Sequence, residues 1–309
     1  MFLVRRAVNH FLEKNSMEKT GGRRRVKHSA GLWRLVFRRF KRHRSGMIGL
    51  GIVLAMVFIA IFAPFIAPYP YDEQNFSERL QPPSLKHPFG TDPLGRDVFS
   101  RVVYGSRISI FIGLVITLLT AVIGITLGLI AGYFGGIVDA VISKVAEIFW
   151  AFPIIVFALA IVAAIGPSVK NVILVLGILM WVSFTKVVRA ETLSIRERMF
   201  IKAAKVIGEN NFKIIIRHVL PNAFPSIIVL ATLTVPDAIL TSAALSFLGL
   251  GVQPPTPEWG AILSDGRLYL RLAPWITIFP GIALFILVLG FNFMGDGLRD
   301  ALDPLMRRR

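Results

Sequence analysis

Apolar and polar positions along this chain fall into long blocks rather than short repeats. Residues 47–66 form an uncharged block that, as a helix, measures about 30 Å, enough for one membrane crossing. Similar blocks predict five further spans, at residues 108–133, 142–164, 171–188, 224–250 and 275–294. The pattern therefore predicts an all-α polytopic membrane protein with six transmembrane helices.

Individual residues inside these blocks predict how the helices pack and end. The second block carries glycine at every fourth position, on one face of the helix: Gly124, Gly128 and Gly132. Small residues at this spacing let helices approach closely, so we expect helix packing here. Pro153 lies inside the third block. Lys170 precedes the fourth block and Lys186 lies near its end, so their long side chains can reach opposite interfaces.

Composition supports a membrane protein, because 54% of residues are hydrophobic, only 17% are charged, and mean hydropathy is +0.66. The chain has no cysteine, which excludes disulfides and thiolate metal sites. Of the net charge of +17, most lies in residues 1–46, which hold 14 Lys/Arg against 2 Glu. A basic cluster beside a span is typical of topology signals and anionic-lipid contacts, so we expect the lipid bilayer as its partner and no nucleic acid.

The N-terminal part divides into a basic tail and a candidate interfacial helix. Residues 1–30 show no sustained period, and the short apolar run near Met1 is broken by Arg5 and Arg6, so no secretory signal is expected; Met17 is an alternative start. Residues 32–40 mix apolar side chains with three arginines, which suits a helix in the headgroup region.

The distribution of Lys and Arg predicts the orientation. One set of connections comprises residues 1–46, 189–217 and 295–309. The opposite set comprises residues 67–107, 166–170 and 251–273. The first set holds 25 Lys/Arg and the second 8, so both termini and the central loop are expected in the cytoplasm, with 67–107 as an outer loop.

The central loop has helical periodicity of its own. Apolar residues recur at three- and four-residue spacing in two groups: Met199, Ala203, Val206 and Ile207, then Phe212, Ile215 and Ile216. We expect two short amphipathic helices, separated by a turn at Gly208, with Pro221 closing the second. Two interpretations are open: the apolar stripe packs on its own chain, or it docks on another protein.

The spacing Ala203-Ala204-x3-Gly208-x9-His218-x-Leu220-Pro221 resembles the EAA loop of permease subunits in ATP-binding-cassette (ABC) importers. The resemblance implies that loop 189–222 couples the membrane subunit to an ATPase subunit by docking in its groove. The implied coupling residues are Lys202, Ala203, Ala204, Gly208, His218, Leu220 and Pro221. Lys202 stands where the family has glutamate, so an ion pair or cap built on that acid is not expected.

Further motifs extend the resemblance over nearly the whole chain after residue 30. Residues 87–101, HPFGTDPLGRDVFSR, are similar to the HPLGTDxLGRDxxSR signature of C-type permeases in the dipeptide/oligopeptide/nickel branch. Other matching motifs lie at residues 131–136, 244–251 and 295–300. The resemblance implies a type I importer permease fold with its core at 108–294, in the inner membrane, taking up dipeptides or oligopeptides, with nickel or another small solute as the alternative. It also implies three kinds of partner: a second homologous permease, two ATP-binding subunits and an extracytoplasmic substrate-binding protein.

The chain carries no motif for chemistry of its own. It lacks the GxxxxGK[ST] phosphate loop and a His/Asp/Glu cluster, so no catalytic, cofactor-binding or metal residue is expected, and ATP with Mg is assigned to the partner ATPase subunits. Asp92 and Asp97 resemble an acid/base pair only superficially. In a loop rich in Gly and Pro we expect them to cap turns and pair with Arg96 or Arg101, fixing a loop that meets the substrate-delivering protein.

Asp237 is the clearest charge inside a predicted span. With Thr234, Thr241 and Ala244 it shares one helical face that is small and polar enough to line a translocation path. The alternative is a structural hydrogen bond to a neighbouring helix. Asn292 is a weaker candidate, expected in helix packing.

Two other functional classes remain as alternatives. An ion-coupled secondary transporter would normally carry several buried ionisable groups or interrupted half-helices in two repeats, and the chain has one Asp and no clear repeat. A non-transporting scaffold would share the central loop but leave the polar face around Asp237 without a role. Uptake that depends on ATP rather than on an ion gradient argues against the secondary transporter. Absence of any solute flux indicates the scaffold.

Overall fold

The computed structural model describes residues 28–302, and nearly all of them are helical. The described residues divide into two units, residues 28–39 and 40–302. In the first unit, the described residues belong to α2 (His28–Arg42), where Arg34 and Arg38 are exposed, as an interfacial helix requires. The predicted basic tail (1–30) falls almost entirely outside the described residues, as do residues 303–309.

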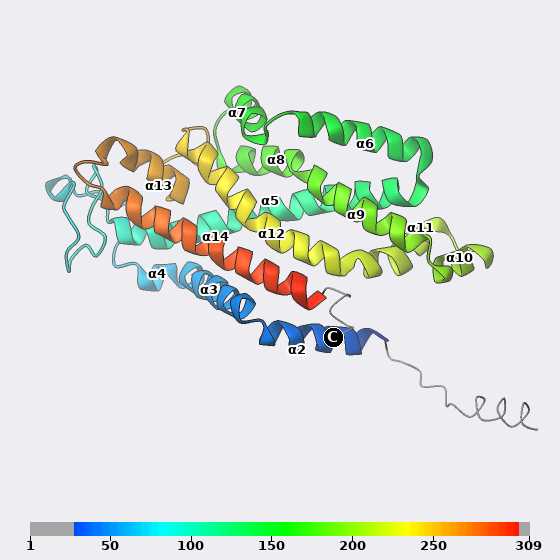
Figure 1. The fold of residues 1–309 in the computed structure, drawn as a ribbon. Coiled ribbons are helices and arrows are strands. Elements are labelled where there is room, and N and C mark those ends of the chain that lie inside the picture. Colours follow the sequence, from blue (N-terminus) through cyan, green and yellow to red (C-terminus); the bar gives the residue numbers. More distant parts are fainter. Residues whose placement is uncertain (1–27, 303–309) are drawn as a thin grey trace, which may run out of the picture. The chain divides into compact units, whose positions relative to one another are not determined.

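The second unit is a bundle of helices joined by short connections and two longer ones (Figure 1). Its elements are α3 (Arg44–Ile61), α4 (Ala63–Ile66), η1 (Phe76–Glu78), α5 (Val98–Phe134), α6 (Gly136–Ala151), α7 (Ile154–Ile165), α8 (Val169–Leu179), α9 (Trp181–Arg196), α10 (Met199–Val206), α11 (Asn211–Ile214), the wider π-helical turn η2 (Ile215–Val219), α12 (Leu220–Phe247), α13 (Trp259–Gly266), η3 (Arg267–Tyr269) and α14 (Trp275–Leu302).

Within residues 28–302, five helical segments are long and apolar enough to cross a membrane: α3, α5, α8 with α9, α11 through α12, and α14. A sixth crossing results if α6 and α7, bent by 85°, count as one span. The third predicted span, 142–164, is therefore two helices rather than one. The break falls at Phe152 and Pro153, because proline lacks an N–H and disfavours helical backbone in the residue before it.

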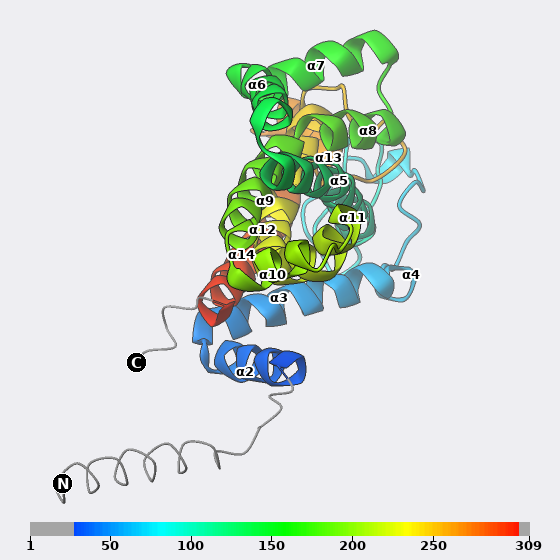
Figure 2. The ribbon, with the colours of Figure 1, turned by 90° about the vertical axis from the view of Figure 1, so that its right-hand side faces the viewer.

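Helix α5 lies at the centre of the bundle, with its most extensive contacts to α9 and α12 (Figure 2). The predicted close packing of its glycines is confirmed, since they face α9. A Cβ on Gly124 would stand 2.4 Å from the Cβ of Phe184, too close for any side chain. Thr185 strengthens this seam by donating its hydroxyl to the Gly124 carbonyl at 3.1 Å. On another side of the bundle, α14 packs along α3, where Gly49 permits close approach.

The helical stretch from α11 through η2 into α12 is uninterrupted, so the prediction that Pro221 closes a helix is wrong. Proline normally disrupts a helix because its ring meets the carbonyl four residues earlier. That residue is Arg217, which lies in the wider turn of η2, and Pro221 itself occupies the first turn of α12, where a missing N–H costs little.

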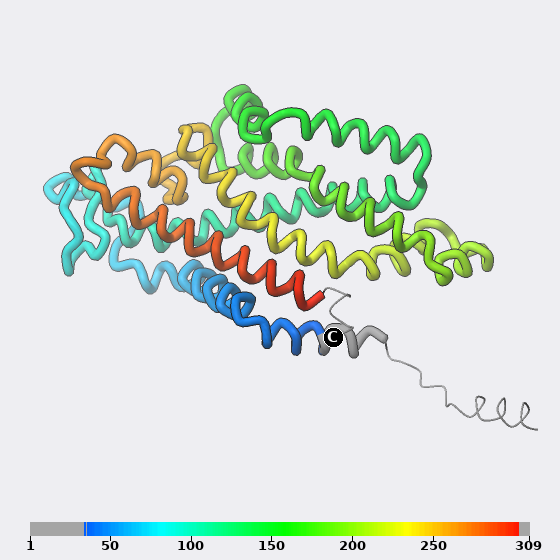
Figure 3. Tube along the Cα trace, viewed as in Figure 1, coloured from blue at the N-terminus to red at the C-terminus, as the bar shows by residue number. Residues whose placement is uncertain are grey.

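Two structures occupy opposite ends of the long helices (Figure 3). One is the loop cap, comprising residues 67–97 with α13. The other is the α10–α11 segment, comprising residues 197–219. These two ends carry most of the candidate functional residues.

Candidate docking surface, loop cap and path residues

The α10–α11 segment forms the two short helices expected from its periodicity. Gly208 ends the first with φ +79°, a conformation that side-chain-bearing residues rarely adopt. Asn210 begins the second, its side-chain oxygen accepting the Phe212 N–H at 2.9 Å. The turn between the helices is thus specified by glycine and a capping amide.

One face of this segment is anchored in the bundle. Ile201 and Ile214 are completely buried, and Ala204 is nearly so. They belong to a hydrophobic cluster with Val188 and Ile195 of α9. Burying two isoleucine side chains stabilises this attachment by roughly 3–6 kcal/mol, so the segment is part of the folded bundle rather than a loose loop.

The other face is apolar and exposed. Met199, Val206, Ile207 and Phe212 have between 73% and 87% of their surface accessible. Ala203 is exposed beside them, whereas Ala204 faces inward. Of the stripe that the periodicity singled out, Ile215 is buried in the bundle, and the other members are not covered by the described part of this chain. An exposed apolar patch of this kind marks an interaction surface.

Ion pairs run along the edge of the segment. Lys202, in the glutamate position of the EAA pattern, lies 3.3 Å from Glu197. Glu209 accepts a hydrogen bond from His218 at 2.9 Å and lies 3.5 Å from Lys213. Partial burial acts to raise the pKa of Glu209, but the His218 hydrogen bond and the Lys213 charge outweigh it, so its pKa is lowered. The His218–Glu209 hydrogen bond thus joins η2, which precedes α12, to the turn between α10 and α11.

Tyr133, at the end of α5, connects the segment to the centre of the bundle. Its hydroxyl donates to the Asn211 side chain at 2.7 Å, and the Lys205 ammonium lies 5.0 Å from its ring centroid. Arg196 donates to the carbonyl oxygen of Tyr133 at 3.0 Å. The sequence marked residues 131–136 only as a motif, because a contact between residues 78 positions apart leaves no periodic signal.

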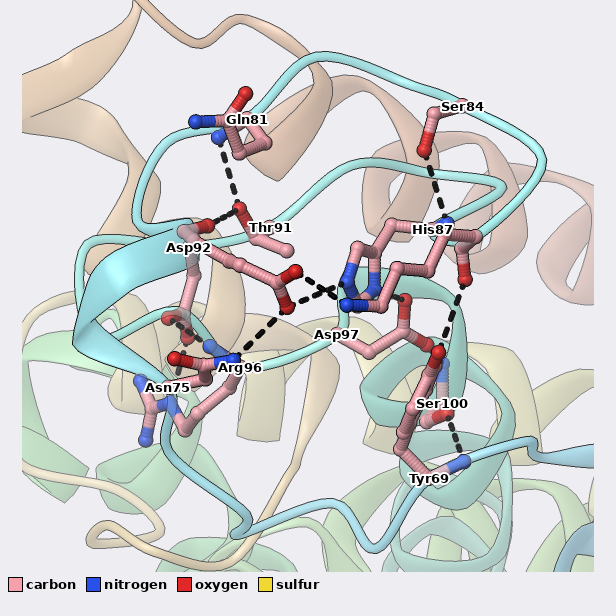
Figure 4. A network of polar contacts seen from close by, with 12 residues as sticks. Tyr69, Asn75, Gln81, Ser84, His87, Thr91, Asp92, Arg96, Asp97 and Ser100 are labelled. Atoms are coloured by element: carbon pink, nitrogen blue, oxygen red, sulfur yellow. Dashed lines mark hydrogen bonds and ion pairs between the residues drawn. The ribbon is translucent and has the colours of Figure 1, made fainter.

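At the opposite end, the loop cap is built around buried charges (Figure 4). Asp92 is fully buried and accepts from Arg96 Nε and Arg101 Nη1, both at 2.6 Å. Both guanidinium groups also lie 3.2 Å from Asp265 on α13. The predicted pairing of Asp92 with these arginines is confirmed, and Asp265 is an additional member that the sequence did not indicate.

Asp97 acts as a cap, as expected, but its side-chain partner is not the expected arginine. It caps α5 by accepting the Ser100 N–H at 2.7 Å, and its other oxygen lies 2.9 Å from His87 Nδ1 (Figure 4). His87 lies 3.3 Å from Glu78, which also pairs with Lys86; the hydrogen bonds from Lys86 and His87 lower the pKa of Glu78. A polar cavity of about 130 Å³ lies beside this cluster.

The path candidates on α12 are only partly brought together. Asp237 is exposed, and its carboxylate has no hydrogen-bonding partner in the described part of the chain, so the alternative of a structural hydrogen bond is absent there. Thr241 is half-buried and donates to the backbone carbonyl of Asp237 at 2.7 Å. Thr234 is buried and donates to Leu230 within its own helix. Asp237, Thr241 and the half-buried Ala244 are accessible, and Thr234 is not.

Among residues 28–302, no group of three or more His, Asp or Glu side chains is placed to hold a metal ion. The described ionisable clusters are paired internally, in the loop cap and along the α10–α11 segment.

The long apolar helices define a polytopic helical membrane protein. The chain belongs to the family of binding-protein-dependent transport system inner membrane components, whose model matches residues 124–308. Residues 31–83 match the N-terminal TM domain of oligopeptide transport permease C. The predicted resemblance to C-type permeases is thereby confirmed, and the chain is a transport subunit, not an enzyme.

Individual relatives carry related names. The dipeptide transport system permease protein DppC of Alkalihalophilus pseudofirmus is 49% identical, covering 89% of this chain and 90% of the relative. The glutathione transport system permease protein GsiD of Pectobacterium atrosepticum is 42% identical, covering 89% and 92%. The oligopeptide transport system permease protein OppC of Bacillus subtilis is 39% identical, covering 91% and 92%.

The fold also matches a solved transporter. An inward-facing structure of the MetNI methionine ABC transporter superposes with a TM-score of 0.56 at 22% identity, covering 66% of this chain and 97% of that chain. The predicted fold class, an all-α type I ABC importer permease, is confirmed.

Proposed function

We propose that this chain is the C-type permease of an ATP-driven importer that takes up dipeptides or short oligopeptides. Its complex contains a second homologous permease, two ATP-binding subunits that hold ATP and Mg, and an extracytoplasmic substrate-binding protein. The substrate assignment is supported by the relatives named for dipeptides and oligopeptides, of which the dipeptide permease is 49% identical. The glutathione permease, itself named for a peptide, is consistent with the same solute class.

The exposed apolar face of α10 and α11 is the observation that carries the coupling proposal. Four large apolar side chains are largely accessible there, and Lys202, Lys205 and Lys213 surround them. A face edged by three lysines does not suit the hydrocarbon core of a bilayer. It suits a groove on a soluble subunit, with an apolar floor and a polar rim.

The position of this face supports the proposed orientation. Lys and Arg are concentrated in connections on the side that includes residues 189–217, which assigns the α10–α11 segment and both termini to the cytoplasm. The loop cap then lies outside, where a substrate-binding protein delivers its solute.

The two faces of the α10–α11 segment provide a route by which closure of the ATPase pair moves the helix bundle. The exposed face moves with the docked ATPase subunit, and the buried face carries that motion to α5 and α9 through Ile201, Ile214 and the Tyr133–Asn211 hydrogen bond. Because cores are close-packed, such a shift is passed on rather than absorbed. ATP-driven closure of the ATPase pair would thus change access to the path.

Docking is tested by changing one exposed residue at each end of the molecule. Ile207→Asp places a charge in the proposed interface, where burying it without a partner is costly; about tenfold less ATPase subunit should co-purify with the tagged permease. Leu268→Asp is the matched control, because Leu268 is 81% exposed, close to the 80% of Ile207, but lies next to α13. Equal ATPase recovery from both variants would contradict the docking site.

The transport proposal is tested with the purified complex in proteoliposomes containing the binding protein. Uptake of a dipeptide should require ATP and continue when ion gradients are abolished. Uptake driven by an ion gradient without ATP would restore the secondary-transporter alternative, and recovery of the chain without ATPase or flux would favour a scaffold.

A further inference from the structure

The break between α6 and α7 lies within a segment that is apolar enough to span the membrane. Pro153 has no N–H to offer the last carbonyl groups of α6. Non-helical backbone at membrane depth is tolerated only where protein covers it or where it lines a water-filled cavity. The described part of this chain does not cover it, since Trp150 and Phe152 are 56% and 59% exposed.

An unpaired lysine reaches the same break from the neighbouring helix. Lys186 lies in α9, and its ammonium is 3.3 Å from the centroid of the Trp150 ring, on the last turn of α6. That this side chain reaches an interface stays a prediction. About 15 Å of helix separates Lys186 from Arg196, the last residue of this helical segment.

The surroundings of Lys186 differ from those of the next basic residue on the helix. Arg189 is neutralised by Asp139, with Nη2 and Oδ2 2.6 Å apart. Lys186 has no acidic partner in the described residues, and its ammonium lies over the ring of Trp150 in the last turn of α6. An aromatic face alone does not replace the hydration that an ammonium loses when it is surrounded by lipid.

We propose that the α6–α7 break, with Trp150 and Lys186, lines the translocation path, and that Lys186 binds a carboxylate of the passing solute. Water in the path hydrates the ammonium, which accounts for both its exposure and its missing acid. Asp237, exposed on α12 and also without a partner, carries the opposite charge, so the two side chains match the ends of a zwitterionic peptide. The solute class rests on the proposed function; the placement of Lys186 on an aqueous path does not depend on which solute is carried.

The native absence of cysteine provides a direct test. Ser183 is exposed three residues before Lys186 on the same face of α9, so Ser183→Cys places a thiol beside the ammonium without removing it. In the assembled complex, this thiol should react with water-soluble methanethiosulfonates. Relative to their rates with a free thiol in solution, the anionic sulfonatoethyl reagent should be favoured several-fold over the cationic trimethylammonium reagent, and adding Lys186→Gln should bring this normalised ratio toward one.

Two results would overturn the proposal. One is a Ser183→Cys thiol that stays unreactive with and without nucleotide, which means that lipid or a partner subunit covers the face. The other is a reagent ratio unchanged by Lys186→Gln. Thr185→Cys is the matched control: it is a near-isosteric change on the same helix, but Thr185 is buried against α5 and its thiol should remain unlabelled.

Solute recognition is tested by uptake of a dipeptide as the free acid and as its C-terminal amide. Lys186→Gln should lower the free-acid/amide uptake ratio at least fivefold relative to the unmodified complex, and Lys186→Arg should largely restore it. The comparison between variants cancels any preference of the binding protein. An unchanged ratio overturns carboxylate binding, whereas absence of dipeptide uptake by the unmodified complex overturns the proposed function and leaves the labelling result to decide the path.

Discussion

The two ends of the helix bundle handle charge in opposite ways. In the loop cap, the charges of Asp92 and Arg101 are buried and joined across the fold to Asp265. In the α10–α11 segment, the ion pairs lie at the surface, as for Lys202 and Glu197. The exposed side chains between them are apolar. The buried charges of the cap are therefore neutralised within this chain, whereas the apolar face of the segment is left uncovered by the described residues.

Because of this difference, ion pairs contribute unequally to the stability of the two ends. Removing one member of a buried ion pair costs about 3–5 kcal/mol, because the remaining charge is left without compensation. An exposed pair contributes about 0–1 kcal/mol. Substitutions of paired residues in the cap should therefore affect folding, and those in the segment should affect assembly and coupling.

The largest expected effect is at Asp92. Asp92→Asn leaves the buried guanidinium groups of Arg96 and Arg101 with only Asp265, and should destabilise the subunit by about 3 kcal/mol. The measurement is the thermal-denaturation midpoint of the purified complex. Glu197→Gln, which removes a surface pair with Lys202, is the control and should shift stability by less than 1 kcal/mol. Similar shifts in both variants would remove the distinction between the two ends.

A smaller effect on stability, but a large one on function, is expected at Gly208. Gly208→Val forces a branched side chain into a backbone with φ +79°, at a cost of about 1–3 kcal/mol, and should change the angle between α10 and α11. Transport per ATP hydrolysed should fall severalfold in proteoliposomes. Gly249→Val is matched in strain, with φ +85° and open space around it, but lies where α12 ends, away from the segment. Equal loss of coupling in both variants would argue against a special role for the turn.

The smallest effect is the dependence of stability on pH. The pKa of Glu78 is held below its ordinary value of 4.5 by hydrogen bonds from Lys86 and His87. A lowered pKa in the folded state contributes stability that is present above pH 4.5 and is lost as the pH falls through the folded value. The denaturation midpoint should therefore drop as the pH falls below 4.5, and Glu78→Gln should reduce the drop. A drop of the same size in the variant would assign the acid sensitivity to other carboxylates, such as Glu209.

Much of the fold follows from the pattern of apolar residues, because a membrane span must bury nearly every side chain in lipid or protein. The spacing of Gly124, Gly128 and Gly132 predicted a close helix contact, since spacing along one helix is a local property, but it did not identify α9 as the partner. Pro153 and Pro221 mark the limit of such reasoning. Both lack an N–H, yet one breaks a span and the other continues one, because the wider turn of η2 accommodates Pro221.

The candidate sites were predictable to the extent that they are local. The apolar stripe of α10 and α11 is visible in the spacing of residues 199–216, and the pairing of Asp92 with Arg96 joins residues four apart. Asp265 lies more than 160 positions from its arginines, and Lys186 meets Trp150 across two helices. Such contacts depend on the bundle geometry, which no single segment specifies.

Helix α5 physically joins the two ends. It begins at the Asp97 cap inside the outer network, ends at Tyr133 against the α10–α11 segment, and contains no proline over its 37 residues. That length corresponds to about 55 Å of continuous helix. Because no proline interrupts α5, we expect a displacement along its axis at one end to be passed to the other end. Docking of a loaded binding protein at the outer end and closure of the ATPase pair at the opposite end would then both act on α5. Helix α5 would in this way couple the two events.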